Sequence, residues 1–212
     1  MGAAWSVPRW HRLPILAGLA GLHLGCYLLV TRVNAGRDPS AFWTLATPAD
    51  ALIPHLPATW PLYWLTYPFV VLGGGYALWH ADTTAWRRGV VAAIGVTLVG
   101  AAWQLLMPAV APWPVEPSPI MRAYHEGGLV LPYANLPSMH VTYGVLAAGF
   151  LHGVVRSRIV HHVAAVVAAG IVISTLTLKE HYVLDAVTGL GLALGATWWW
   201  QRGHRPDHGE AA

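Results

Sequence analysis

Residues 159–200 read IVHHVAAVVAAGIVISTLTLKEHYVLDAVTGLGLALGATWWW. Two apolar runs, 159–178 and 182–200, stand on either side of a short polar turn. About 20 apolar residues in helical conformation are enough to cross the hydrocarbon core of a bilayer. The stretch therefore predicts two membrane-spanning helices joined as a hairpin.

The composition of the whole chain agrees with a membrane protein. Of its 212 residues, 56% are hydrophobic and only 10% are charged, whereas roughly a quarter of the residues are charged in a soluble domain. Such a chain cannot cover its surface with polar side chains, so lipid must cover it. The net charge of +3 comes from basic residues in the short connections between apolar runs. This pattern indicates membrane orientation and does not indicate nucleic-acid binding.

Four further apolar runs bring the number of predicted spans to six. They are residues 13–31, 61–80, 89–107 and 139–155. The first run resembles a signal peptide because Arg9 and Arg12 precede it, but its length and the lack of a small-residue cleavage site favour a span. We therefore expect an all-α integral membrane protein. Its single domain, residues 1–202, is a bundle of six transmembrane helices, and a polar tail, 203–212, follows it.

Basic residues divide unequally between the two sides of this predicted bundle. With the N-terminus inside, the cytoplasmic segments hold Arg9, Arg12, Arg87, Arg88, Arg156, Arg158, Arg202 and Arg205. The outer segments hold Arg32, Arg37, Arg122 and Lys179. Because cytoplasmic loops are enriched in Lys and Arg, we expect both termini to be cytoplasmic, in a plasma or inner membrane.

The outer connections are the elaborate ones. Residues 32–60 and 108–137 are long and rich in proline, and loops of this length are usually functional or disordered. Within the first of them, DALIPHLPATW at 50–60 predicts a short interfacial helix between the first and second spans. At the other side, Trp198 to Trp200 beside Arg202 are typical of an aromatic belt.

The turn before the last span carries a titratable pair. Asp185 is the only Asp, Glu, Lys or Arg inside the six predicted spans, and a carboxylate within a span indicates function. His181 lies four residues earlier, so the two side chains share one face if the helix begins near Lys179. The carboxylate would then fix one imidazole nitrogen and leave the other as a nucleophile or base. A structural His–Asp pair between helices is the alternative.

A second group stands where the fourth span begins. Pro137 and Ser138 form a helix-start signal, and a helix N-terminus favours an anion such as phosphate. Ser138 adds a hydroxyl donor, and His140 can protonate a leaving group; an ordinary helix cap is the alternative. Since the fourth and sixth spans both enter the membrane from the outer side, the two groups can converge. Phosphoryl transfer and metal binding both use such a set of residues.

These residues resemble a known family. PSMH at 137–140, followed by STLTLKEHYVLDAVTG at 174–189, is similar to the P-S-x-H and S-R-x5-H-x3-D motifs of the type 2 phosphatidic acid phosphatase superfamily. The resemblance implies that His181 is a nucleophile forming a phosphohistidine and that Asp185 orients it. It further implies that His140 is the general acid and Ser138 a phosphate ligand. No metal and no other cofactor is implied.

The chain departs from the family pattern at its phosphate-binding cations. Thr175 stands where the family has an arginine, and the earlier K-x6-R-P motif is replaced by MPAVAPWPVEPSP at 107–119. Lys179, and more weakly Arg122, are the candidate substitutes. His125 and Glu126 are candidate contacts for a substrate head group.

The departures resemble a divergent branch that contains inositol phosphorylceramide synthases. Pro108, Pro112 and Trp113, together with DALIPHLP upstream, are similar to its sequence. That branch implies transfer of the phospho-group to an alcohol.

Three classes of function therefore stay open. The first is an enzyme that removes phosphate from a lipid such as a phosphatidate or polyprenyl phosphate, or passes it to an alcohol. The second is a metal- or haem-binding membrane protein, with His140, His181 and Asp185 as a two-histidine, one-carboxylate triad, or with His23 and His152 as haem ligands. The third is a transporter or channel, which the concentration of polar residues at one face disfavours.

Overall fold

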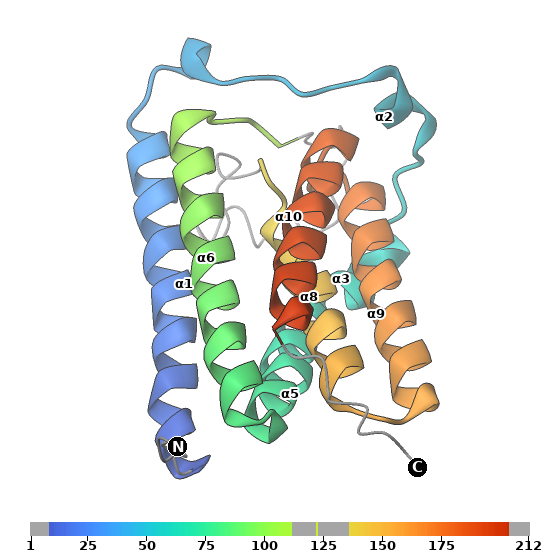
Figure 1. The fold of residues 1–212 in the computed structure, drawn as a ribbon. Helices are drawn as coiled ribbons and strands as arrows, with labels where there is room; N and C mark the ends of the chain where they lie inside the picture. Colours follow the sequence, from blue (N-terminus) through green and yellow to red (C-terminus); the bar gives the residue numbers. More distant parts are fainter. Residues whose placement is uncertain (1–8, 112–121, 123–135, 204–212) are drawn as a thin grey trace, which may run out of the picture.

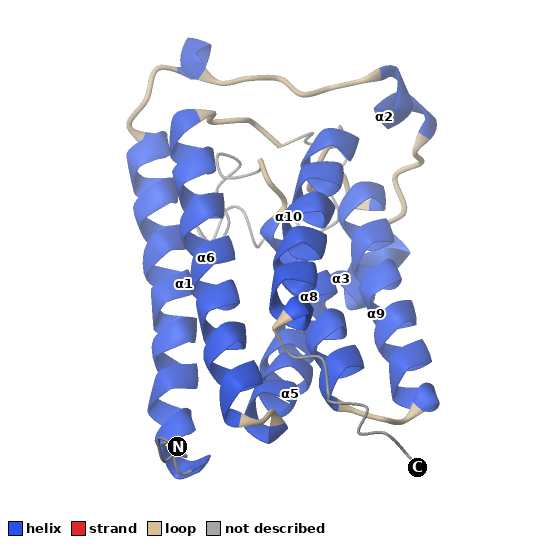
Figure 2. Ribbon diagram, in the orientation of Figure 1, coloured by secondary structure: helices blue, strands red, loops and turns tan. Residues whose placement is uncertain are grey.

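The protein is a bundle of helices. The structure, a computed structural model, describes residues 9–111, 122 and 136–203. Every regular element within these ranges is helical (Figure 2), which confirms the predicted all-α class. The long helices stand side by side (Figure 1); they are α1 (Arg12–Ala35), α6 (Thr83–Leu106), α8 (Met139–Val154), α9 (Arg158–Thr177) and α10 (Val183–Arg202).

Three helices are long and apolar enough to cross a membrane. They are Arg9–Ala35, which joins the short η1 (Arg9–His11) to α1, together with Thr83–Leu106 and Arg158–Thr177. Helix α8 has 16 residues, fewer than the about 20 that a straight crossing needs. Membrane crossing by the remaining three predicted spans stays a prediction.

The predicted span at 61–80 is helical but irregular. It is a succession of short pieces: α3 (Trp60–Trp64), α4 (Thr66–Pro68), the π-helical turn η4 (Phe69–Gly74) and α5 (Gly75–His80). Pro68 has no N–H for the carbonyl four residues earlier, so the regular hydrogen-bond ladder is interrupted here. The apolar run thus predicted a helical segment, but it did not predict the irregular turns, because apolar composition does not report the regularity of the backbone.

Both functional motifs lie at one end of the bundle. Helices α1, α6 and α9 finish there, and the connection after α1 crosses above them, carrying η2 (Pro39–Ala41), α2 (Pro48–Leu52) and η3 (Pro57–Thr59) (Figure 1). Helices α8 and α10 start at the same end, since the N–H of Ser138 donates to the carbonyl of Asp185 at 3.0 Å. A short helix is thus present near the predicted place, as α2, and its position at a membrane interface stays a prediction.

The core at the opposite end is centred on Trp200. Its side chain is fully buried, packs edge-on against Phe150 and donates from Nε1 to the carbonyl of Ala85 at 2.8 Å. Trp198 and Trp199 are exposed, at 55% and 40%. The prediction of a belt from all three tryptophans was therefore wrong for Trp200. Consecutive helical residues are spaced about 100° apart, so three in a row cannot all face outward.

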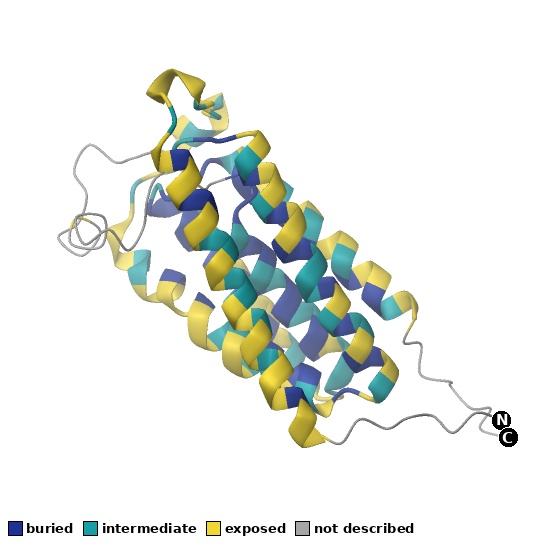
Figure 3. Cartoon of the chain, turned by 90° about the vertical axis from the view of Figure 1, so that its left-hand side faces the viewer, coloured by how far each residue is buried: buried dark blue, intermediate teal, exposed yellow. Residues whose placement is uncertain are grey.

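The outer faces of the helices carry large apolar side chains. Exposed residues follow the outside of each long helix (Figure 3), and among them Leu28, Val91, Val166 and Leu194 are each more than half exposed. A soluble monomer rarely exposes so much contiguous apolar surface. The surface is compatible with an integral membrane protein.

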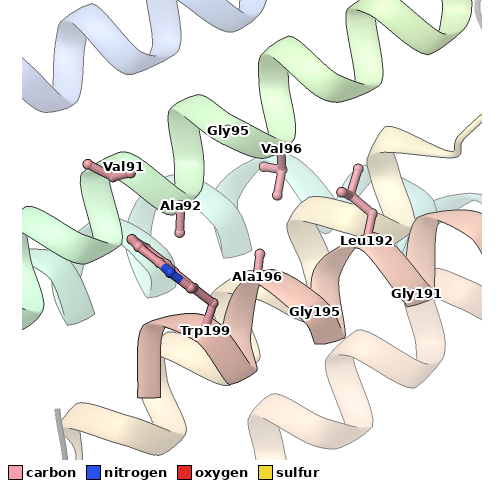
Figure 4. A pocket seen from close by; sticks show the side chains of 9 residues that line it. All are labelled: Val91, Ala92, Gly95, Val96, Gly191, Leu192, Gly195, Ala196 and Trp199. Carbon is pink, nitrogen blue, oxygen red and sulfur yellow. The ribbon is translucent and has the colours of Figure 1, made fainter. Parts of the chain in front are cut away.

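Small residues control how closely α10 approaches its neighbours. A Cβ at Gly189 would lie 2.5 Å from the carbonyl oxygen of Ser138 and 3.1 Å from the hydroxyl of Thr142. On the side facing α6, Gly191 and Gly195 have no such contact. They help to line an apolar cleft of about 370 Å³ between α6 and α10 (Figure 4). Close packing of α10 on α8, and not on α6, therefore sets the distance between the two motifs.

The contact at Gly189 predicts a stability difference. Gly189→Ala should lower the free energy of unfolding by about 1–3 kcal/mol, because the new methyl group meets the backbone of α8. Gly191→Ala is the matched control; it lies two residues away in open space and should be neutral or stabilising by up to about 1 kcal/mol. Thermal unfolding in detergent measures both variants. Equal destabilisation would contradict the close approach.

Candidate active site

His181 and Asp185 approach each other across the start of α10. His181 Nδ1 lies 3.5 Å from Asp185 Oδ2. The helix begins at Val183 and not near Lys179 as expected, because the Asp185 carboxylate accepts the Tyr182 N–H at 2.9 Å and caps this end. His181 therefore lies in the turn before the helix. The predicted pairing does not need a shared helix face.

The pair is buried. His181 is 5% exposed and Asp185 is fully buried. Within the described ranges, neither His181 Nδ1 nor Asp185 Oδ1 has a hydrogen-bond partner. A distance of 3.5 Å is longer than a strong charge-assisted bond, and catalytic contacts of this kind commonly tighten when substrate binds. The geometry leaves the imidazole close to a carboxylate oxygen, so that a small rotation completes the bond.

Ser138 occupies the N-cap of α8. Its hydroxyl accepts the Val141 N–H at 3.4 Å, and its own N–H donates to the carbonyl of Asp185. The side chain is fully buried. This residue thus joins the starts of the two helices that carry the candidate catalytic groups.

His140 lies in the first turn of α8 and faces His181. The two ring centroids are 5.9 Å apart. The Tyr63 hydroxyl lies 3.5 Å from His140 Nδ1, and the Tyr67 hydroxyl lies 3.3 Å from Nε2. Each nitrogen of this imidazole therefore has a phenol beside it, and at least one phenol must donate while the ring is neutral.

Neither Tyr63 nor Tyr67 is recognisable from the sequence as a residue of the site. They come from the interrupted segment α3–α4, and Tyr63 is buried whereas Tyr67 is 40% exposed. Together with Trp60 and Trp64 they form an aromatic row, in which Trp60 is stacked on Tyr63 and Trp64 is tilted against Tyr67. The spacing 60, 63, 64 and 67 is that of one helix face, but aromatic residues near a membrane surface have a simpler reason to be there.

Lys179 has an unusual backbone and an occupied ammonium. Its φ is 60°, in the left-handed region where glycine is normal. Its Nζ donates to the carbonyls of Asp50 and Ile53 at 2.9 and 2.6 Å. One of its three N–H donors is left for a phosphate. A phosphate bound by Lys179 would therefore use a side chain that also has a structural role.

Asp50 lies on α2 and touches the same turn. Partial desolvation acts to raise its pKa, but hydrogen bonds from Thr47 and Val183, with the nearby charge of Lys179, outweigh it and hold the pKa below its ordinary value. A lowered carboxyl pKa in the folded state stabilises the protein above the unfolded-state pKa of about 4. This contribution is lost as the pH falls through the folded-state value.

The other predicted residues are less closely involved. Arg122 is exposed, and His125 and Glu126 lie outside the described residues. Thr175 is fully buried, its hydroxyl donates to the carbonyl of Val172 at 2.8 Å, and its own carbonyl accepts from the turn. The position that carries a cation in the family is thus occupied here by a residue of the last turn of α9, whose carbonyl accepts from the N–H groups of Glu180 and His181.

The metal and haem hypotheses find little support in the donor geometry. Among the described residues, no three His, Cys, Asp or Glu side chains form a group that could hold a metal ion. His23 packs edge-on against Tyr143 in the bundle, and His152 packs against His161. The two proposed haem ligands each face another aromatic ring.

The fold and the site together define a helical protein with an apolar exterior, in which a histidine–carboxylate pair and a second imidazole meet at one end of the bundle. The chain belongs to the PAP2 superfamily, the description of the family model that matches residues 37–199. The match confirms the resemblance to the type 2 phosphatidic acid phosphatase superfamily and supports phosphatase-type phosphoryl transfer in general. No curated protein and no solved structure matches the chain.

Two serines with the same local geometry separate capping from phosphate binding. Ser138 caps α8 and Ser157 caps α9, with N–H to Oγ distances of 3.4 and 3.5 Å. Ser138→Ala and Ser157→Ala should each cost about 0.5–2 kcal/mol of stability. If Ser138 also binds phosphate, only its variant should lose turnover of a lipid phosphate by more than about tenfold. Equal activities in the two variants would leave Ser138 as a cap alone.

Proposed function

We propose that this protein is an integral membrane enzyme that takes the phosphate group from a lipid through a covalent intermediate on His181. The observation that carries the proposal is the arrangement of three buried or half-buried groups at one end of the bundle. His181 lies 3.5 Å from Asp185, and the ring of His140 lies 5.9 Å from that of His181. Few reactions other than phosphoryl transfer use two imidazoles and one carboxylate beside a helix start.

The first half-reaction forms the intermediate. The Nε2 lone pair of His181 attacks phosphorus, and the P–O bond to the lipid alcohol breaks in line with it. His140 donates its proton to the departing oxygen. The Nδ1–H of His181 donates to Asp185, whose charge offsets the positive charge that develops on the ring.

The second half-reaction releases the phosphate. Water gives a proton to His140 as its oxygen attacks phosphorus, and the N–P bond returns its electron pair to His181. The α8 N-terminus, Ser138 and the remaining N–H of Lys179 are the proposed donors to the phosphate oxygens, with Arg122 as a weaker candidate. Dephosphorylation is the simplest overall reaction. Because the chain itself supplies every proton carrier, we propose no metal and no other cofactor.

Transfer to an alcohol is the second candidate reaction. The aromatic row that ends beside His140 favours it, because Trp64 and Tyr67 are 38% and 40% exposed and offer apolar faces with a polar edge. A polyol could stack on such a row and present a hydroxyl to His140. The chemistry is unchanged, with the alcohol in place of water.

We further propose six membrane crossings with the site on the non-cytoplasmic side. The cationic residues at the far end of the bundle support this orientation. Arg12, at the start of α1, and Arg88, near the start of α6, are two of them, and Arg88 donates to the carbonyls of Trp199 and Trp200. Both termini would then be cytoplasmic, with α2 near the outer interface.

The decisive experiment measures the products of both candidate reactions, hydrolysis and transfer. Purified protein is incubated with phosphatidate and polyprenyl phosphate, with and without inositol, while free phosphate and new lipids are measured. His181→Ala should abolish turnover and leave the unfolding temperature in detergent nearly unchanged. Substantial activity in this variant would rule out the nucleophile, and a stoichiometric transition metal required for turnover would favour the metal-binding alternative. Free phosphate alone supports hydrolysis, and a new head-group lipid supports transfer.

The carboxylate can be tested without removing its cap. Asp185→Asn keeps an oxygen to accept the Tyr182 N–H, so α10 should still begin at Val183. The neutral amide cannot stabilise a positive imidazole, and kcat should fall roughly 10²- to 10⁴-fold with a smaller change in KM. Steady-state kinetics on the lipid phosphate measure both parameters. An unchanged kcat would assign Asp185 to helix capping only.

A further inference from the structure

The turn that carries His181 has a strained backbone. Helix α9 ends in a pair of reversed hydrogen bonds, from Lys179 N–H to the Leu176 carbonyl at 3.2 Å and from Glu180 N–H to the Thr175 carbonyl at 3.1 Å. This pattern normally places glycine in the left-handed position. Here that position is Lys179, with φ 60°, and a side chain there costs about 1–2 kcal/mol. Contacts outside the turn must offset that cost.

Those contacts come from α2 through the Lys179 side chain. The ammonium donates to the carbonyl oxygens of Asp50 and Ile53. Carbonyls in the last turn of a helix have no intrahelical partner, so a cation there satisfies two acceptors at once. A glycine at position 179 would relieve the backbone and lose both bonds.

The carboxylate of Asp50 holds the other side of the turn. Its Oδ1 accepts the N–H of Val183, the first residue of α10, at 2.8 Å. Its Oδ2 accepts both the N–H and the hydroxyl of Thr47, each at 2.7 Å. One carboxylate therefore caps α2 and α10 together. Since Asp50 satisfies Val183, the carboxylate of Asp185 can serve Tyr182 and still face His181.

Two further bonds connect the same pair of segments. Leu56 N–H donates to the Thr177 carbonyl at 2.8 Å, and the hydroxyls of Thr59 and Thr177 are 2.8 Å apart. The segment 47–59 is thus attached to the end of α9 as well as to the start of α10. The contacts surround His181 on both sides in the sequence.

We propose that Asp50 is a positioning residue for the reaction. Its carbonyl holds Lys179 and its carboxylate holds Val183, the residues two before and two after His181, and the imidazole is thereby kept facing Asp185. The inference rests on the proposed function, because it gives Asp50 a role in placing the nucleophile. Asp50 does not touch the reacting atoms itself.

The test compares two capping aspartates. Asp38 caps η2 in the same connection, and its Oδ1 accepts the N–H and hydroxyl of Ser40 at 2.8 and 2.6 Å. Asp50→Ala removes the acceptor for the Val183 N–H and should lower kcat for a lipid phosphate by about 10- to 100-fold, because a displacement near 1 Å is enough for such a loss. KM should change by less than about threefold, since the lipid site is left intact. Asp38→Ala should keep both parameters within about twofold of the parent protein.

A measurement that needs no turnover separates the two proposals. Hydrogen exchange in detergent should show faster exchange over residues 179–186 in Asp50→Ala and an unchanged rate there in Asp38→Ala, because only the first loses the acceptor for the Val183 N–H. Faster exchange with an unchanged kcat would overturn the positioning role. Unchanged exchange would show that Asp50 does not hold the turn, and this too would overturn the proposal. If the parent protein turns over no lipid phosphate, the proposed function fails and the positioning role fails with it. Exchange would then still report whether Asp50 holds the turn.

Discussion

The hydrogen bond from Ser138 N–H to the Asp185 carbonyl, 3.0 Å long, is the contact on which the site depends. It joins the first turn of α8 to the first turn of α10, and these two turns carry His140 and the His181–Asp185 pair. The bond forms only because α10 has no side chain at Gly189, where any Cβ would meet the Ser138 carbonyl. Between membrane helices, close packing of small residues replaces the hydrophobic effect as the source of association. The geometry of the candidate site is therefore set by a glycine that has no chemistry of its own.

Polar side chains inside the bundle donate hydrogen bonds chiefly to backbone carbonyls near helix ends. Arg12 donates to the carbonyls of Leu78 and Ala81 at the end of α5, and Gln104 donates to the carbonyl of Pro137 at 3.1 Å. In a lipid environment a free backbone group has no water to bond with. A chain with broken helices must therefore supply its own partners. The irregular segment α3–α5 needs such partners. It also places the hydroxyls of Tyr63 and Tyr67 beside the two ring nitrogens of His140.

Much of this arrangement could be predicted from local sequence. Apolar runs gave the helices α1, α6, α8, α9 and α10 within a few residues, and the spacing of His181 and Asp185 gave the pair. What could not be predicted depends on contacts between distant residues. Asp50 and Val183 are 133 positions apart, and Tyr63 and His140 are 77 apart. A capping aspartate and an interfacial tyrosine look ordinary in a sequence, because only the fold shows which helix end or imidazole each one meets.

In the proposed reaction, the missing family cation changes how the phosphate would be held. Thr175 stands at that position, and its hydroxyl and carbonyl both form hydrogen bonds at the end of α9. The site therefore lacks a positive charge there and has a hydrogen-bonded turn instead. Lys179, four residues later in the sequence, supplies a positive charge, but two of its three N–H donors bond to the carbonyls of Asp50 and Ile53. A phosphate held by one ammonium N–H and the dipole of a helix start is bound less tightly than one held by a planar arginine fork. Weaker ground-state binding is no disadvantage in catalysis, provided that the same groups bind the transition state better. The arrangement favours an enzyme that depends on accurate placement of His181 more than on a high density of positive charge.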